Sequence, residues 1–269
     1  VDHEISFEPI FDEYGNMSIG NIEVAPSNPD IIYMGTGEPL HARSSAHGNG
    51  MWKSMDAGKT WTHIGLEESY FIPKIAIDFN NPDVVYAAAE GKLYSNEADC
   101  QRGLYKTEDG GETWVQVLDL KDRGVGEFVM DPGNSDVVIA GAYKTYRRTW
   151  TFIDRQPDNH FYKTTDGGKT WKKLTNGLPL DIKTGWNGIT MYPKDPNIVY
   201  IRMDEEVNLG LDDRKGRQLY REGRLFREDF TFSSFTSFTV PNALKKMVDF
   251  EPLQAEDEEE LVEKVNKII

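Results

Sequence analysis

The sequence of 269 residues contains a single cysteine, Cys100, which excludes a disulfide bond within the chain. It also has no run close to the roughly 18 apolar residues that a membrane-spanning helix needs. Basic residues are in the minority, because 30 Lys and Arg stand against 45 Asp and Glu and give a formal net charge of −15. Nucleic acid is therefore not an expected partner, since phosphate contacts require a basic face.

Aromatic residues and turn formers are plentiful by contrast. Hydrophobic residues make up only 38% of the chain, yet aromatic residues reach 12%, and there are 24 Gly and 13 Pro. This balance is typical of an all-β fold with many short strands and turns.

One short motif, Asp-x-Gly-x-Thr-Trp, ends three similar stretches at residues 54–61, 107–114 and 164–171. Its aspartates are 53 and then 57 residues apart. A second motif runs in phase with it at 28–33, 81–86, 134–139 and 195–200, and an apolar strand-like run precedes each copy. A period of this length, kept by several motifs, indicates a repeat architecture.

Each repeat is predicted to contain four strands. The alternating apolar run gives the first strand, and the run that follows an Asn-Pro-Asp turn gives the second. A third strand at 51–54, 104–107 or 161–164 then leads through the aspartate motif into a fourth strand. Four-stranded sheets repeated at this period predict a β-propeller, in which each sheet is one blade.

The chemistry of the turn motif predicts a role in folding. The aspartate can accept hydrogen bonds from backbone N–H groups of its own turn, the glycine permits a positive φ, and the tryptophan can pack between neighbouring sheets. Because active sites are rarely repeated in every blade, we expect these residues to be structural and not catalytic. They are Asp56, Gly58, Trp61, Asp109, Gly111, Trp114, Asp166, Gly168 and Trp171.

These motifs resemble the BNR/Asp-box repeat superfamily of β-propellers, and we call the turn motif the Asp box from here on. The stretch at 35–39, followed by 50–54, is most similar to sortilin/Vps10-like and "glycosyl hydrolase-like" bacterial repeat proteins. The resemblance covers about residues 17–203. It implies the fold, but the superfamily includes sialidases, xyloglucanases, sorting receptors and photosystem assembly factors, so it implies no single activity.

The expected organisation is a propeller at 1–240, followed by an acidic tail with an amphipathic C-terminal helix at 241–269. Blades are expected near 17–66, 70–119, 123–176 and 184–232, which gives four to five blades or an incomplete ring. The fourth repeat has strand-like residues at 218–221 but lacks an Asp box. In the tail, apolar residues at helical spacing follow an acidic run, and the helix at 255–269 is a candidate for docking on a partner subunit.

The connections between the second and third strands are the longest irregular segments: 38–49, 90–102, 144–160 and 204–217. All four are expected on the face opposite the Asp boxes, and their length indicates function. Arg, Trp and Tyr are also the residue types that dominate interface hot spots. The candidate binding residues are His41, Arg43, His47, Tyr146, Arg147, Arg148, Trp150 and Arg155, with Arg147, Arg148 and Trp150 as the main anchors.

We expect this face to hold a protein or peptide partner, or a subunit of a larger complex, without catalysis. The alternative is a glycoside hydrolase, sialidase-like or xyloglucanase-like, that acts on an extracellular polysaccharide; it predicts two carboxylates roughly 5–10 Å apart in a cleft. A purely structural subunit docked through the C-terminal helix is a third interpretation. His41, His47, His160 and Cys100 lack close ligand spacing, so neither a metal nor another cofactor is expected.

The chain begins with Val1 and not with Met, which fits removal of a leader peptide. Together with the resemblance, this favours a secreted or periplasmic protein.

Overall fold

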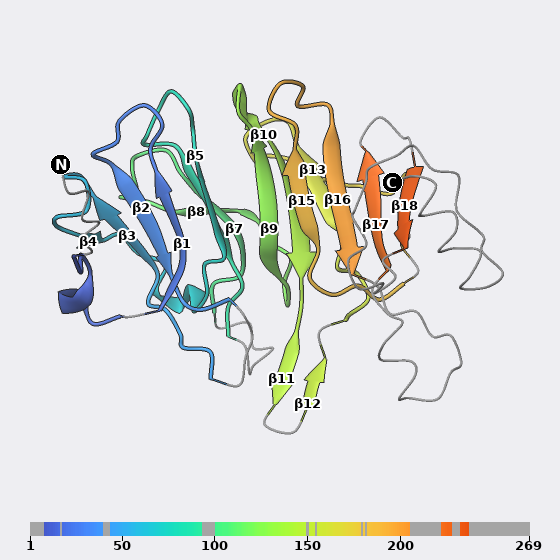
Figure 1. Ribbon diagram of the computed structural model, residues 1–269, viewed down its shortest axis with the longest axis horizontal. Coiled ribbons are helices and arrows are strands. Elements are labelled where there is room, and N and C mark those ends of the chain that lie inside the picture. The colour runs from blue at the N-terminus through green and yellow to red at the C-terminus, as the bar shows by residue number, and fades with distance from the viewer. Residues whose placement is uncertain are drawn as a thin grey trace, which may run out of the picture.

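The computed structural model describes residues 8–16, 18–39, 44–92, 100–148, 151–153, 155–178, 180, 182–204, 222–227 and 232–236. These residues form four antiparallel four-stranded sheets, which follow one another along the chain and lie side by side (Figure 1). The prediction of an all-β fold is confirmed.

Three sheets take their strands in the order in which the chain supplies them. The first contains β1 (Ile19–Val24), β2 (Ile32–Thr36), β3 (Met51–Ser54) and β4 (Thr62–His63). The second contains β5 (Lys74–Ile77), β6 (Val85–Ala89), β7 (Gly103–Thr107) and β8 (Val115–Leu118). The fourth contains β15 (Gly188–Met191), β16 (Val199–Asp204), β17 (Glu222–Arg227) and β18 (Phe232–Thr236).

The third sheet carries an insertion between its second and third strands. It is built from β9 (Gly124–Asp131), β10 (Asn134–Tyr143), β13 (Phe161–Thr164) and β14 (Lys172–Lys173). Between β10 and β13 the chain forms a separate hairpin of β11 (Tyr146–Arg148) and β12 (Thr151–Ile153). The expectation of an irregular loop throughout 144–160 is therefore wrong, because six of these residues pair as strands.

The sheets pack through their first strands, so that β1 lies against β5, β5 against β9, and β9 against β15. Small residues permit this close approach, and Ala87, Ala88 and Ala89 of β6 are fully buried. Tyrosine hydroxyls join one sheet to the next: Tyr33 donates to a backbone carbonyl at residue 82, and Tyr86 to one at residue 135, each at 2.9 Å.

Two 3₁₀ turns precede the first strands of the first two sheets. These turns are η1 (Asp12–Tyr14) and η2 (Glu67–Ser69). Phe11 and Tyr14, at the first of them, stack on each other and pack on Trp52 and Trp61 of the first sheet. This N-terminal segment thus covers the outer part of the first sheet on the side away from the second sheet, where no other described sheet packs.

Most of the C-terminal predictions fall outside the described residues. The third strand of the fourth sheet runs over Glu222–Arg227, whereas the strand-like residues expected at 218–221 lie outside the described residues. The predicted helix at 255–269 also lies outside them. Within the described part of the chain, no helix has the length and apolar character needed to cross a membrane.

Candidate functional site

The two ends of the blades are built from different kinds of residue. The Asp boxes lie at one end, in the turns between the third and fourth strands of the first three sheets. In the second sheet, Asp109 Oδ1 accepts hydrogen bonds from the Thr113 backbone N–H at 2.9 Å and the Thr107 hydroxyl at 2.6 Å. Its Oδ2 accepts one from the Thr113 hydroxyl at 2.5 Å. Asp56 and Asp166 make the same three contacts with their own turns.

These contacts stabilise the ionised carboxylates. Hydrogen bonds from Thr60 lower the pKa of Asp56 to about 2, and those from Thr170 lower the pKa of Asp166 to about 2. The pKa of Asp109 also lies well below its usual range, for the same reason. A carboxylate held this firmly in the charged form is a poor general acid near neutral pH.

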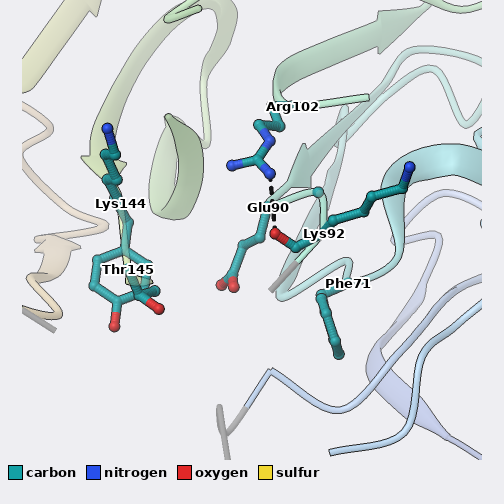
Figure 2. A pocket seen from close by; sticks show the side chains of 8 residues that line it. Phe71, Glu90, Lys92, Arg102, Lys144 and Thr145 are labelled. Atoms are coloured by element: carbon teal, nitrogen blue, oxygen red, sulfur yellow. Dashed lines mark hydrogen bonds between the residues drawn. The ribbon is translucent and has the colours of Figure 1, made fainter. Parts of the chain in front are cut away.

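The connections between second and third strands lie at the opposite end, where a small pocket opens between the second and third sheets (Figure 2). Its lining residues are Phe71, Glu90, Gly91, Lys92, Arg102, Tyr143, Lys144 and Thr145. It has room for about one water molecule.

Arg102 organises one side of the pocket from a buried position. Its guanidinium donates to the Lys92 carbonyl at 2.9 Å, as Figure 2 shows, and to the Asp122 carbonyl at 3.4 Å. Its Nε lies 2.9 Å from Cys100 Sγ. Because Lys92 and Cys100 lie at the two ends of the β6–β7 connection, Arg102 holds those ends together.

A network of charged groups organises the other side. The Asp122 carboxylate receives the Lys144 ammonium at one oxygen and the Arg123 guanidinium at the other, the latter at 2.6 Å. Arg123 also lies 3.8 Å from Asp158, whose other oxygen is 3.2 Å from His160 Nε2. Asp122 and Arg123 lie directly before β9, and Lys144 lies directly after β10. The network therefore fixes the base of the connection that bears the β11–β12 hairpin.

His160 is buried within this network, and burial lowers its pKa, with the charges of Lys173 and Arg123 acting in the same direction and Asp158 opposing them. Its Nδ1 is buried without a hydrogen-bond partner in the described part of the chain. His160 is thus a neutral, packed residue at neutral pH, and it is not a free ligand.

The β11–β12 hairpin extends beyond the ends of the four sheets (Figure 1). The Arg147 guanidinium lies over the Phe152 ring, 4.6 Å from its centroid. Phe152 and Ile153, two adjacent large apolar residues of β12, are 39% and 45% exposed. The hairpin therefore presents apolar and cationic surface to solvent together.

The predicted binding residues are only partly described. His47 packs its ring against Tyr70 and against Phe71 of the pocket, with centroids 5.5 and 6.0 Å apart. Arg147 and Arg155 belong to the third connection, and both are partly buried. Tyr146 and Arg148 lie in β11, while His41, Arg43 and Trp150 lie outside the described residues.

The structure also brings together charged residues that the sequence analysis did not single out. Glu127 of β9 lies 3.7 Å from Lys74 of β5. Burial raises the pKa of Glu127 and that of Glu23 in β1, and Lys74 opposes both shifts. The sequence does contain one signal for this cluster. Asn21, Lys74 and Glu127 follow one another at intervals of 53 residues, so they occupy the same position in three successive repeats.

Comparisons with known proteins agree with this architecture. The sequence model of the Sortilin-Vps10 family, described as sortilin and neurotensin receptor 3, matches residues 49–251. Vacuolar protein sorting/targeting protein 10 of Colletotrichum graminicola is 30% identical over 99 residues, which cover 37% of this chain and 6% of that protein. A xyloglucanase of a Paenibacillus species is 23% identical over 182 residues, covering 60% of this chain and 16% of the enzyme.

The fold is similar to that of solved propellers. The GH74 enzyme of Niastella koreensis superposes with a TM-score of 0.50 at 18% identity, covering 81% of this chain and 30% of that one. The chain thus spans only a small part of the length of these three relatives. Because the family match covers most of the sequence, the chain belongs to the Sortilin-Vps10 family of β-propeller proteins.

Proposed function

We propose that this domain binds a protein or peptide partner on the face opposite the Asp boxes and does so without catalysis. The observation that carries the proposal is the β11–β12 hairpin, which projects from that face and exposes Phe152 and Ile153 beside Arg147. Exposed apolar residues next to arginine form the kind of patch that dominates binding energy in protein interfaces. Arg148 and Trp150 belong to the same segment and complete the proposed anchor set with Arg147.

The surroundings of the hairpin support this proposal. The charged network of Asp122, Arg123 and Lys144 fixes the base of the hairpin before a partner binds. Binding therefore costs less conformational entropy than it would for an unstructured loop. The neighbouring pocket has room for about one water molecule. His47 lies at its rim, and together with Arg155, Tyr146, His41 and Arg43 it extends the proposed surface around the hairpin.

A second candidate function rests on a different part of the molecule. Xyloglucanases are among the relatives, and Glu23 and Glu127 are two carboxyl groups whose pKa values burial raises on either side of Lys74. Glycosidases need one carboxyl group that stays protonated near neutral pH. This pair is the proposed catalytic candidate if the domain hydrolyses a polysaccharide, and hydrolysis of xyloglucan is the reaction to assay.

The remaining proposals follow from the family. A sorting receptor and polysaccharide hydrolases both meet their ligands outside the cytosol, so we place this protein in a secreted or periplasmic location. The Asp-box residues are proposed to stabilise the blades, and the segment 241–269 is proposed as an appendage that docks on a partner subunit.

The binding proposal is tested by changing Arg147, Arg148 and Trp150 together to Ala and recovering native partners with the immobilised protein. The matched control replaces two exposed cations and an exposed aromatic residue elsewhere, Lys172, Arg202 and Tyr192. We expect at least a tenfold loss of partner recovery in the first variant and none in the control. Equal recovery from both variants would remove the hairpin as the anchor.

The hydrolase candidate is tested with the unchanged protein and with Glu127→Gln on xyloglucan and other β-glucans. The non-catalytic proposal expects no reducing ends from any of these substrates. Turnover by the unchanged protein that disappears in Glu127→Gln would instead establish the second candidate.

A further inference from the structure

The β11–β12 hairpin is a sheet of its own. Backbone N–H and C=O groups of an antiparallel strand point in alternating pairs toward the two sides of the strand, so each strand can pair on both sides. Within the described residues, β12 pairs only with β11. The hairpin also lies beyond the ends of the four sheets, as Figure 1 shows. The far edge of β12 is therefore an edge along which no described strand lies.

The composition of β12 does not protect this edge. Folded proteins commonly blunt an exposed edge strand with lysine, proline or inward-pointing charges. β12 consists instead of Thr151, Phe152 and Ile153, three uncharged residues of high β propensity. Phe152 and Ile153 point to opposite faces because they are adjacent in a strand, and both are exposed. A strand that lay alongside β12 would thus bury apolar surface on both faces.

The position of Arg147 indicates the charge of such a strand. Arg147 is the cross-strand partner of Phe152, and its guanidinium lies 4.6 Å from the centroid of the Phe152 ring. The cation is thus held over β12. Because neighbouring strands lie about 4.8 Å apart, a residue opposite Phe152 on an added strand would come next to this guanidinium. A carboxylate there would attract the cation, whereas an ammonium group would repel it.

The local charge agrees with this position and is opposite in sign to that of the whole chain. In residues 144–155, four cations stand against one acid, which gives a formal charge of +3. Without Lys144, which pairs with Asp122, the segment still carries +2. The whole chain has a formal net charge of −15. An acidic segment is therefore attracted to the hairpin but not to the protein as a whole.

We infer that the edge of β12 accepts an extended acidic segment of a partner protein as a third strand. Acidic side chains of this segment lie on the face of Arg147 and Phe152, and apolar side chains lie on the face of Ile153, so the two kinds alternate. Backbone hydrogen bonds hold an added strand of this type, and its alternating side chains select it. The inference rests on the proposed function, because it specifies the partner and the binding mode of the same hairpin.

The test uses short capped peptides and the unchanged full chain, with fluorescence anisotropy as the measure of binding. The first peptide alternates Glu and Val, and two matched peptides carry Ser or Lys in place of Glu. A fourth peptide has the Glu–Val sequence with a methyl group on every backbone nitrogen. It keeps its charge and side chains but has no N–H group to donate to a neighbouring strand.

We expect the Glu–Val peptide to bind at least tenfold more tightly than the Lys–Val peptide, with the Ser–Val peptide between them. Attraction by the whole protein predicts the opposite order, because a net charge of −15 favours the Lys–Val peptide. Methylation of the backbone is expected to weaken binding at least tenfold. Undiminished binding of the methylated peptide would overturn strand addition, and tighter binding of the Lys–Val peptide would overturn the acidic character of the partner.

Two variants of the full chain test whether the peptides bind at the hairpin. Arg147→Glu is expected to invert the order, so that the Lys–Val peptide binds more tightly than the Glu–Val peptide. Arg202→Glu is the matched control, because it reverses an exposed cation on β16, and it is expected to keep the original order. The original order in Arg147→Glu would overturn the assignment to this edge.

Other occupants of the edge give different results. Sedimentation of the full chain as a dimer that the Glu–Val peptide dissociates would assign the edge to a second copy and overturn the inference. So would peptide binding that appears only after the acidic run 256–260 is changed to Gln and Asn, because the chain's own tail would then be the occupant.

The recovery of native partners tests the proposed function separately. If the Ala variant at Arg147, Arg148 and Trp150 loses its partners while no peptide binds the unchanged chain, the proposed function stands and strand addition is wrong. If the Glu–Val peptide binds as expected while partner recovery is unchanged, the edge accepts an acidic strand and the proposed function is wrong.

Discussion

The Asp-box end of each blade and the connection end differ in how closely they repeat. Asp56, Asp109 and Asp166 make the same hydrogen bonds in three sheets, with distances that agree within about 0.2 Å. At the other end, one connection is held by the Arg102 guanidinium and another carries a projecting hairpin. Repetition at one end thus accompanies stability of the individual blade, whereas variation at the other leaves room for a specific ligand.

This comparison predicts that the largest losses of stability come from the repeated end. Gly111→Val places a branched side chain against Ile64 at a backbone φ of +99°. Strain and overpacking together are expected to lower the free energy of unfolding by about 3 kcal/mol. Chemical denaturation measures the loss.

Gly177→Val is the matched control for that substitution, because it introduces the same side chain. Gly177 also has a positive φ, +72°, but no atom lies within 4 Å of an added methyl group. Its cost is therefore expected to stay near 1 kcal/mol, from backbone strain alone. Equal losses in the two variants would show that packing over the boxes does not matter.

Removing one box carboxylate is expected to have the next largest effect. Asp109→Ala leaves the Thr113 backbone N–H and two hydroxyls without their acceptor. We expect the melting temperature to fall by about 5 °C while partner recovery stays unchanged. Loss of binding at unchanged stability would contradict the division between the two ends.

Acid is expected to weaken the same end. The pKa values of Asp56 and Asp166 are near 2 in the folded protein, against about 3.9 in an unfolded chain. Because the folded values are lower, the stabilisation is complete above about pH 4 and is lost as the pH falls from about 4 to 2. Asp166→Asn should flatten this part of the stability curve. An equally steep curve in the variant would assign the acid sensitivity to other groups.

The smallest effect on stability is expected at the hairpin. Arg147→Ala removes the cation–π contact with Phe152, which is partly exposed to water. The free energy of unfolding should change by no more than about 1 kcal/mol, whereas partner recovery should fall severalfold. A large loss of stability would mean that the hairpin supports the sheets.

The local chemistry of the boxes made the repeated end predictable from sequence. Asp, Gly and Trp at fixed spacing specify a turn whose hydrogen bonds close within about five residues, so no distant partner has to be known. Alternation also assigns the buried face of the first strands β5 and β15, whereas the corresponding residues of β1, Ile22 and Val24, are 47% and 49% exposed. The four sheets and their order follow from these two signals.

The connection end was predictable only in outline. Its position opposite the boxes follows from strand order, but the pairing of β11 with β12 does not, because residues 144–153 lack the Gly or Asn that marks a hairpin turn. Glu23 and Glu127 were missed for another reason. Polar residues in an alternating strand normally face water, and only the packing of β1, β5 and β9 brings both acids near Lys74.

The tyrosine hydrogen bonds that join neighbouring sheets end on backbone carbonyls and not on side chains. Tyr33 donates to the carbonyl of a proline, and Tyr86 to that of a serine, with the same 2.9 Å distance. Such a bond recognises the path of the main chain, so the acceptor residue is free to mutate without loss of the contact. A gene for this fold can therefore gain or lose whole repeats by duplication or deletion, because newly adjacent blades need no matched side chains at these positions.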